Sequence, residues 1–208
     1  MAIASTEPSQ APMIDTRFKT AAFMCFFSVI LGIIGMPIRI FVGLQKSAVL
    51  NFFIDAPLTI VTFVISIYIF LQLKRLLVER LHLHNMSNLI NTIIIIYIFG
   101  TVINFLLSIF QVMVQDPYAG ALFFLIIIIP TMLLGGIISF IFGLRLLEAR
   151  DLPLGLYRTY AILYIIGGAC FFTLILFPIG ILSSMASDVV LGMIFLKESE
   201  NESEVEFV

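Results

Sequence analysis

Long apolar runs alternate with short polar segments along most of the chain. Five of these runs reach, or nearly reach, the ~20 residues that a helix needs to cross the hydrocarbon of a bilayer. Because the runs are continuously apolar, with no alternation of polar and apolar positions, they indicate helices. The pattern predicts five membrane-spanning helices, at about residues 20–42, 52–73, 90–114, 120–144 and 158–178.

A sixth apolar segment, residues 180–196, is interrupted by polar residues. Ser183, Ser184 and Ser187 form a small polar cluster, which Asp188 closes, and only eight apolar residues follow. Eight helical residues extend ~12 Å, which is too short to cross a bilayer. The segment is therefore expected to be re-entrant, interfacial or a short spanning helix. A short spanning helix would bury Asp188 near mid-depth, where it needs a partner.

The predicted fold class is all-α: a polytopic helical membrane protein with five transmembrane helices plus this short sixth segment, in one domain over residues 17–196. Residues 1–16 contain the run Ser-Thr-Glu-Pro-Ser-Gln-Ala-Pro and are expected to form a disordered arm. Residues 197–208 contain five Glu and one Lys, and are expected to form an acidic, disordered tail.

The composition supports a membrane protein. Hydrophobic residues make up 61% of the 208 residues and charged residues 12%, against roughly 45–50% and 25% in soluble domains. The net charge is −2, and since the tail contributes −4, residues 1–196 have a net charge of +2. There is no basic patch for nucleic acid. The expected partners are the lipid bilayer and either another membrane protein or a second copy of the chain.

The basic residues are divided unevenly between the two ends of the predicted helices. On the side of the membrane opposite the N-terminus, the predicted helices place only Arg39 and Lys46. Eight lie on the side of the N-terminus: Arg17, Lys19, Lys74, Arg75, Arg80, Arg145, Arg150 and Arg158. Because cytoplasmic loops are enriched in Lys and Arg, the N-terminus is expected in the cytoplasm. The predicted location is a multi-pass position in a membrane, with the bacterial cytoplasmic membrane as the expected one.

Two charged residues fall beside the same predicted turn. Arg39 lies near the outer end of the first helix and Asp55 opens the second, so antiparallel packing places them at similar depth. Pairing avoids the cost of an isolated charge, on the order of 2.5–3.5 kcal/mol at a helix centre. The favoured interpretation is an ion pair that fixes the hairpin. The alternative is a gate near an outward-facing cavity.

A polar stripe is predicted on the third helix. Gly100, Asn104 and Ser108 share one face by i, i+4 spacing, and Gln111 continues it toward the outer boundary. Small and polar residues usually hold membrane helices together, and a solute site is the alternative. Close helix contacts are also expected at other pairs of small residues: Ser28 with Gly32, Gly135 with Gly136, Gly167 with Gly168, and Gly180 with Ser184.

Sequence motifs for catalysis and for cofactors are absent: there is no G-x-S-x-G, H-E-x-x-H, C-x-x-C, Walker loop or G-x-G-x-x-G. His82 and His84 point apart on a helix, and Cys25 and Cys170 lie inside apolar runs. No enzyme activity, metal or cofactor is therefore expected.

The sequence thus favours a non-catalytic integral membrane protein, acting as an accessory subunit, scaffold or interaction module of a membrane assembly. The first alternative is a small channel or secondary transporter that uses polar groups near Arg39, Asp55, Asn104, Gln111 and Asp188. A second alternative is a lipid-modifying enzyme with Asp188 as its acid or base.

Overall fold

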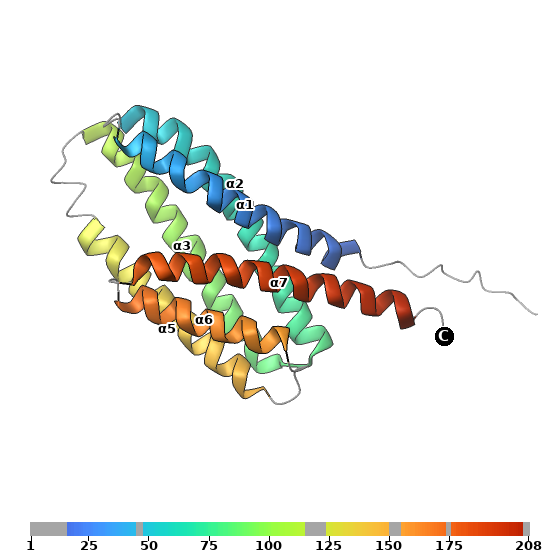
Figure 1. Ribbon diagram of the computed structural model, residues 1–208. Helices are drawn as coiled ribbons and strands as arrows, with labels where there is room; N and C mark the ends of the chain where they lie inside the picture. Colours follow the sequence, from blue (N-terminus) through green and yellow to red (C-terminus); the bar gives the residue numbers. More distant parts are fainter. Residues whose placement is uncertain (1–15, 45–47, 115–123, 150–154, 174–175, 206–208) are drawn as a thin grey trace, which may run out of the picture.

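A computed structural model describes residues 16–44, 48–114, 124–149, 155–173 and 176–205 (Figure 1). All of the regular secondary structure in these residues is helical, which confirms the all-α prediction. The α-helices are α1 (Thr16–Leu44), α2 (Ala48–Arg75), α3 (His84–Val114), α5 (Ile129–Glu148), α6 (Leu156–Thr173) and α7 (Phe177–Val205). Two five-residue π-helices extend this set: η1 (Leu76–Arg80) follows α2, and η2 (Phe124–Ile128) precedes α5.

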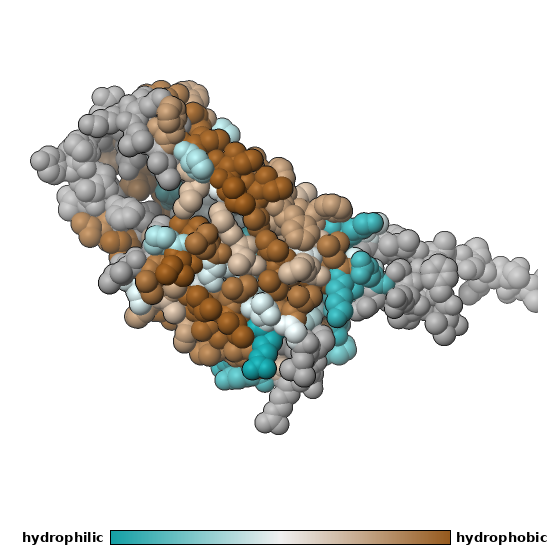
Figure 2. All heavy atoms as spheres, viewed as in Figure 1, coloured by the Kyte–Doolittle hydropathy of each residue, from teal (hydrophilic) through white to brown (hydrophobic). Residues whose placement is uncertain are grey.

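Six segments among the described residues are long and apolar enough to cross a membrane: Thr16–Ile38, Phe52–Arg80, His84–Phe110, Leu125–Glu148, Leu156–Thr173 and Pro178–Glu200. Hydrophobic side chains cover much of the flank of the bundle, whereas the most hydrophilic residues gather toward one end (Figure 2). Large apolar side chains such as Phe53 (70% exposed) and Val64 (60% exposed) point outward. A surface of this kind is stable in lipid and not in water, so the fold is that of a multi-pass membrane protein.

Of the three forms predicted for the sixth segment, the structure matches the spanning helix, but this helix is longer than predicted. α7 is a continuous helix of 29 residues, and its segment Pro178–Glu200 is long and apolar enough to cross a membrane. Its polar cluster does not interrupt the helix, since small hydroxyl side chains bond to nearby carbonyls. Ser183 Oγ donates to the carbonyl oxygen of Leu163 on α6 at 2.8 Å, and Ser187 Oγ donates to that of Ser184 at 2.7 Å. The helix begins beside Pro178, which suits a first turn because that position has no intrahelical N–H bond to lose.

The acidic tail is predicted to begin at residue 197, and α7 continues past that position to Val205. Extending an existing helix costs far less than nucleating one, and Glu is a good helix former. Other limits shift by a few residues: α3 begins at His84 instead of residue 90, and α6 ends at Thr173 instead of residue 178. The predicted arm (residues 1–16) and the start of the fourth span (residues 120–123) lie outside the described residues, except for Thr16.

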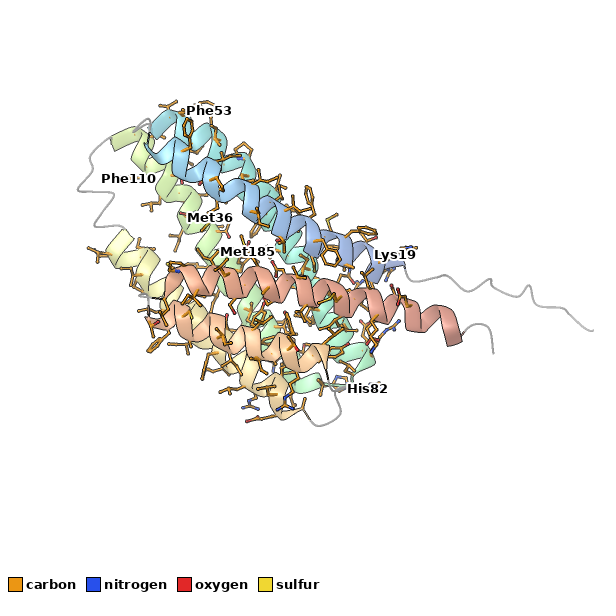
Figure 3. All side chains as sticks on the ribbon, viewed as in Figure 1. Lys19, Met36, Phe53, His82, Phe110 and Met185 are labelled. Carbon is orange, nitrogen blue, oxygen red and sulfur yellow. The ribbon has the colours of Figure 1, made fainter. Side chains whose placement is uncertain are left out.

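The six long helices form a closed ring. Each helix packs on the next one in chain order, and α7 closes the ring by packing on α1. The basic end of the bundle is the end at which α1, α3 and α6 begin and α2, α5 and α7 finish, where Lys19 and His82 lie (Figure 3). The far end is the opposite one, near Met36, Phe53 and Phe110 (Figure 3).

The tightest helix contact is between α5 and α6, at glycines. A Cβ atom on Gly168 would lie 2.6 Å from the carbonyl oxygen of Gly136 and 2.6 Å from the backbone nitrogen of Phe140. A Cβ on Gly143 would lie 2.7 Å from the carbonyl oxygen of Ala161. The two backbones therefore touch, as at the small-residue interfaces of other membrane helices. This part of the close-contact prediction is confirmed, and it gives the ring one rigid side.

The main cluster of buried core residues lies in the half of the bundle nearer the basic end. In α1 its members end at Cys25, in α2 they begin at Ile65, and in α7 they begin at Val190. The largest fully buried side chains of this core are Tyr160, Phe142 and Phe195. Among the described residues, the core cluster has no member in the far half.

Candidate functional site

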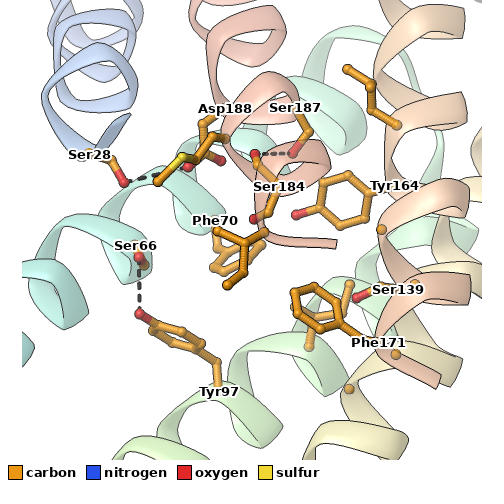
Figure 4. Close-up of a pocket in the computed structure, with 18 of the residues that line it drawn as sticks. Ser28, Ser66, Phe70, Tyr97, Ser139, Tyr164, Phe171, Ser184, Ser187 and Asp188 are labelled. Atoms are coloured by element: carbon orange, nitrogen blue, oxygen red, sulfur yellow. Dashed lines mark hydrogen bonds between the residues drawn. The ribbon is translucent and has the colours of Figure 1, made fainter. Parts of the chain in front are cut away.

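A cavity of about 610 Å³ lies inside the ring, next to the buried core, and all six long helices line it. Its lining is mainly apolar but includes one carboxyl group and several hydroxyls (Figure 4). The hydroxyl groups belong to Ser28, Thr62, Ser66, Tyr97, Ser139, Tyr164, Ser184 and Ser187. Ligand sites of ~300–1,000 Å³ combine an apolar wall with a few polar groups in this way.

The cavity lies halfway along the apolar helices. Ser28 is 12 residues from Thr16, and Asp188 is 12 residues from Glu200, the two limits of the spanning segments at the basic end. At 1.5 Å per residue both are about 18 Å from those limits, in a hydrocarbon core of ~30 Å. α1 and α7 are antiparallel neighbours, so the separate residue counts along the two helices place Ser28 and Asp188 at the same depth.

Asp188 is the single carboxyl group of this lining. Ser28 Oγ donates to Asp188 Oδ2 at 3.5 Å (Figure 4), a long hydrogen bond and therefore a weak one. The residues that line the cavity include no Lys, Arg or His, as far as the chain is described. A carboxyl group at this depth is costly unless something compensates it, and such residues usually mark a functional site.

Aromatic rings form part of the cavity wall: Tyr97 and Phe171 lie away from Asp188, whereas Tyr164 lies on the side of Ser184 (Figure 4). Tyr97 donates a hydrogen bond to Ser66 Oγ at 3.1 Å (Figure 4), and its ring meets that of Phe70 edge-on at 6.0 Å between centroids. Tyr164 packs against Phe142 at 5.1 Å and directs its hydroxyl toward the cavity (Figure 4). Phe171 completes the group.

The basic end is closed by contacts among four elements. Phe18 of α1 stacks on Phe195 of α7 at 5.9 Å, and the Arg80 guanidinium lies 4.8 Å from the centre of the Phe18 ring. Tyr157 donates a 2.9 Å hydrogen bond to Glu198 Oε1, and Arg80 Nη1 lies 3.9 Å from Glu198 Oε2. These contacts join α1, η1, α6 and α7. Together with the buried core, they separate the cavity from the basic end of the bundle.

Of the predicted site residues, only Asp188 lines the cavity. Asp55 is half-buried in the second turn of α2, about 16 Å along that helix from Ser66. Arg39 lies toward the end of α1, but its side chain is outside the described part of the chain, so the predicted ion pair stays a prediction. The same holds for the side chain of Gln111, in the last turns of α3.

Asn104 is exposed on α3 and does not reach the cavity. Its backbone carbonyl accepts the Ser108 hydroxyl at 2.9 Å, and a Cβ on Gly100 would lie 3.2 Å from Thr131 Cγ2 of α5. The stripe therefore begins at the contact with α5, at Gly100, and faces the outer surface at Asn104, further toward the C-terminal end of α3. Asp188 lies beside neither Asn104 nor any described part of Arg39.

Sequence reasoning missed most of the cavity wall. Ser66, Tyr97 and Ser139 are single polar residues in apolar runs, with no spacing that links them. The signal that existed was the set of small-residue pairs, because Ser28, Gly32, Gly135, Gly136, Gly167, Gly168 and Ser184 all line the cavity. Small side chains at these positions let the helices approach closely. Where no neighbouring backbone lies against them, they leave the open space that forms the cavity.

No protein-family model matches the chain, and neither curated proteins nor solved structures show a match to it.

Proposed function

We propose that the chain is a six-span membrane protein of the channel or secondary-transporter class, with a solute site in the central cavity. The observation that carries the proposal is the position of Asp188, at mid-span in a cavity of about 610 Å³. Transporters of many folds bind their solutes near the bilayer midplane, where a helical bundle surrounds a few polar groups.

The basic end is proposed to face the cytoplasm. Arg75, Arg80 and Arg145 close helices there, and Lys19 lies near the start of α1. Basic residues are retained on the cytoplasmic side of spanning helices. With six spans, both the start of α1 and the end of α7 lie on that side. The packed basic end then closes the cavity toward the cytoplasm, and the far end is its route to water.

The accessory or scaffold role is the second candidate, and Asn104 is the observation that favours it. Asn104 is exposed about two-thirds of the way along α3, and an asparagine side chain on an apolar helix gains from a hydrogen-bonding partner on another membrane helix. The partner would be another membrane protein or a second copy of the chain. Native mass spectrometry in mild detergent tests this role, because a monodisperse monomer without copurifying protein would contradict it.

Water access to the cavity is the first expected result of the transport proposal. In a background with Cys25→Ala and Cys170→Ala, Ser139→Cys is expected to react with a water-soluble maleimide, since the thiol would line a hydrated cavity. Leu182→Cys is the control, because that position is 66% exposed but faces outward from α7 into lipid. Labelling is measured in native membranes by the mass shift of the protein. Equal and minimal labelling at both positions would contradict the proposal.

A further inference from the structure

The lining of the cavity also indicates what kind of solute would fit, and this inference rests on the function proposed above. We propose that the solute is an organic monocation of the alkylammonium type, with the Asp188 carboxylate as its counter-charge. The argument has three parts: the charge of the lining, the size of the cavity, and the aromatic wall.

The charge balance favours one positive charge. Asp188 brings a single negative charge when ionised, and none of the lining residues is Lys, Arg or His, over the part of the chain that is described. The Ser28 hydroxyl, which donates a hydrogen bond to Asp188 at 3.5 Å, is neutral. A bound monocation would neutralise the carboxylate where the surrounding lipid cannot, whereas an anion would add a second uncompensated charge.

The size of the cavity favours an organic ion over a bare metal ion. A volume of about 610 Å³ is within the range of small-molecule sites and far larger than a coordination sphere with ligands at 2–2.6 Å. Among the described residues, no three His, Cys, Asp or Glu side chains come together in a way that could hold a metal. The ligand therefore needs an organic group large enough to fill the cavity, as well as a positive charge.

The aromatic residues of the lining provide a binding surface for that organic group. Phe70, Tyr97, Tyr164 and Phe171 contribute four rings to the lining, from α2, α3 and α6. The negative face of an aromatic ring attracts weakly hydrated cations, and quaternary ammonium groups are recognised in this way by other proteins. The remaining lining is apolar or hydroxyl-bearing, which suits alkyl groups. Because the Asp188 carboxylate and these rings line the same cavity, an ammonium group bound there would contact both.

Tetraethylammonium is a suitable probe, with the full chain in lipid nanodiscs and isothermal titration calorimetry as the measurement. The wild type is expected to bind it saturably. Asp188→Asn is expected to lower the affinity at least 10-fold, because it removes the counter-charge and keeps the shape. Asp188→Glu retains the charge and is expected to stay within about 3-fold of the wild type. Asp55→Asn is the matched control and is expected to change the affinity less than 2-fold, since Asp55 does not line the cavity.

The outcomes separate this inference from the function on which it rests. Equal affinity of wild type and Asp188→Asn, with both proteins monodisperse, would overturn the role of Asp188. If the wild type does not bind tetraethylammonium while Ser139→Cys still reacts with maleimide, the cation inference is wrong and the solute cavity stands. If Ser139→Cys is also unreactive, both proposals fall. Loss of binding in Asp188→Asn with retention in Asp188→Glu and Asp55→Asn would support the inference.

Discussion

Gly168→Ala is expected to lower the midpoint of thermal unfolding in detergent by about 6–12 °C. The added Cβ would lie 2.6 Å from two backbone atoms of α5, the carbonyl oxygen of Gly136 and the nitrogen of Phe140. Backbone atoms cannot rotate away as a flexible side chain can, so the two helices must separate. Overpacking of this kind costs about 1–3 kcal/mol, and the upper value corresponds to that shift for a protein of this size.

Gly135→Ala is the matched control for this prediction. Gly135 is next to Gly136 on the same helix, but a Cβ there would have no atom within 4 Å. The midpoint is expected to stay within about 2 °C of the wild type or to rise, since alanine favours a helix by up to ~1 kcal/mol. The measurement is circular dichroism at increasing temperature. Equal midpoints for the two variants would contradict the glycine contact between α5 and α6.

Phe195→Ala is expected to have a comparable effect, in the buried core near the basic end. Phe195 is fully buried, stacks on Phe18, and belongs to the core that closes the basic end. Truncation of a buried Phe removes packing contacts and leaves a void, at a cost of about 3–5 kcal/mol. The expected result is a fall of about 6–20 °C in the midpoint of the same thermal scan.

The control for Phe195→Ala is Phe23→Ala. Phe23 lies in the same half of the bundle on α1, but it is 63% exposed and points outward. Lipid chains can fill the space that its truncation leaves, so a shift below about 3 °C is expected, corresponding to less than ~1 kcal/mol. If the two substitutions lowered the midpoint equally, the basic end would not be the packed part of the molecule.

The helices themselves were predictable from sequence because lipid imposes a simple length rule on apolar runs. The sixth helix was predictable only as one of three alternatives, because a polar cluster and Asp188 divide its apolar residues and leave only eight of them after Asp188. The sequence suggests that Ser183 and Ser187 interrupt the helix. In the structure their hydroxyl groups donate hydrogen bonds to backbone carbonyl oxygens, so a helix can contain them in apolar surroundings. Pro178 was a better boundary signal than the polar cluster.

The candidate site was predictable only in part, for a different reason. Asp188 was recognisable because an isolated carboxyl group in an apolar segment needs an explanation. Its neighbours were not, because Ser28, Tyr97 and Ser139 come from three helices, and their meeting depends on helix rotation. One sequence does not specify that rotation. Asn104 shows the same limit, since helical spacing predicts which residues share its face but not what that face contacts, and Asn104 is exposed.

The central claim is that a hydrated cavity at mid-membrane is closed at the basic end and reached from the far end. Side-specific labelling of Ser139→Cys with a membrane-impermeant maleimide tests it most directly, in the background without native cysteines. Lys19→Cys, an exposed position at the basic end, reports which side the reagent has reached. The account predicts that Ser139→Cys reacts when reagent is added to the side where Lys19→Cys does not. Reaction of Ser139→Cys only from the side that labels Lys19→Cys, or from neither side, would contradict it.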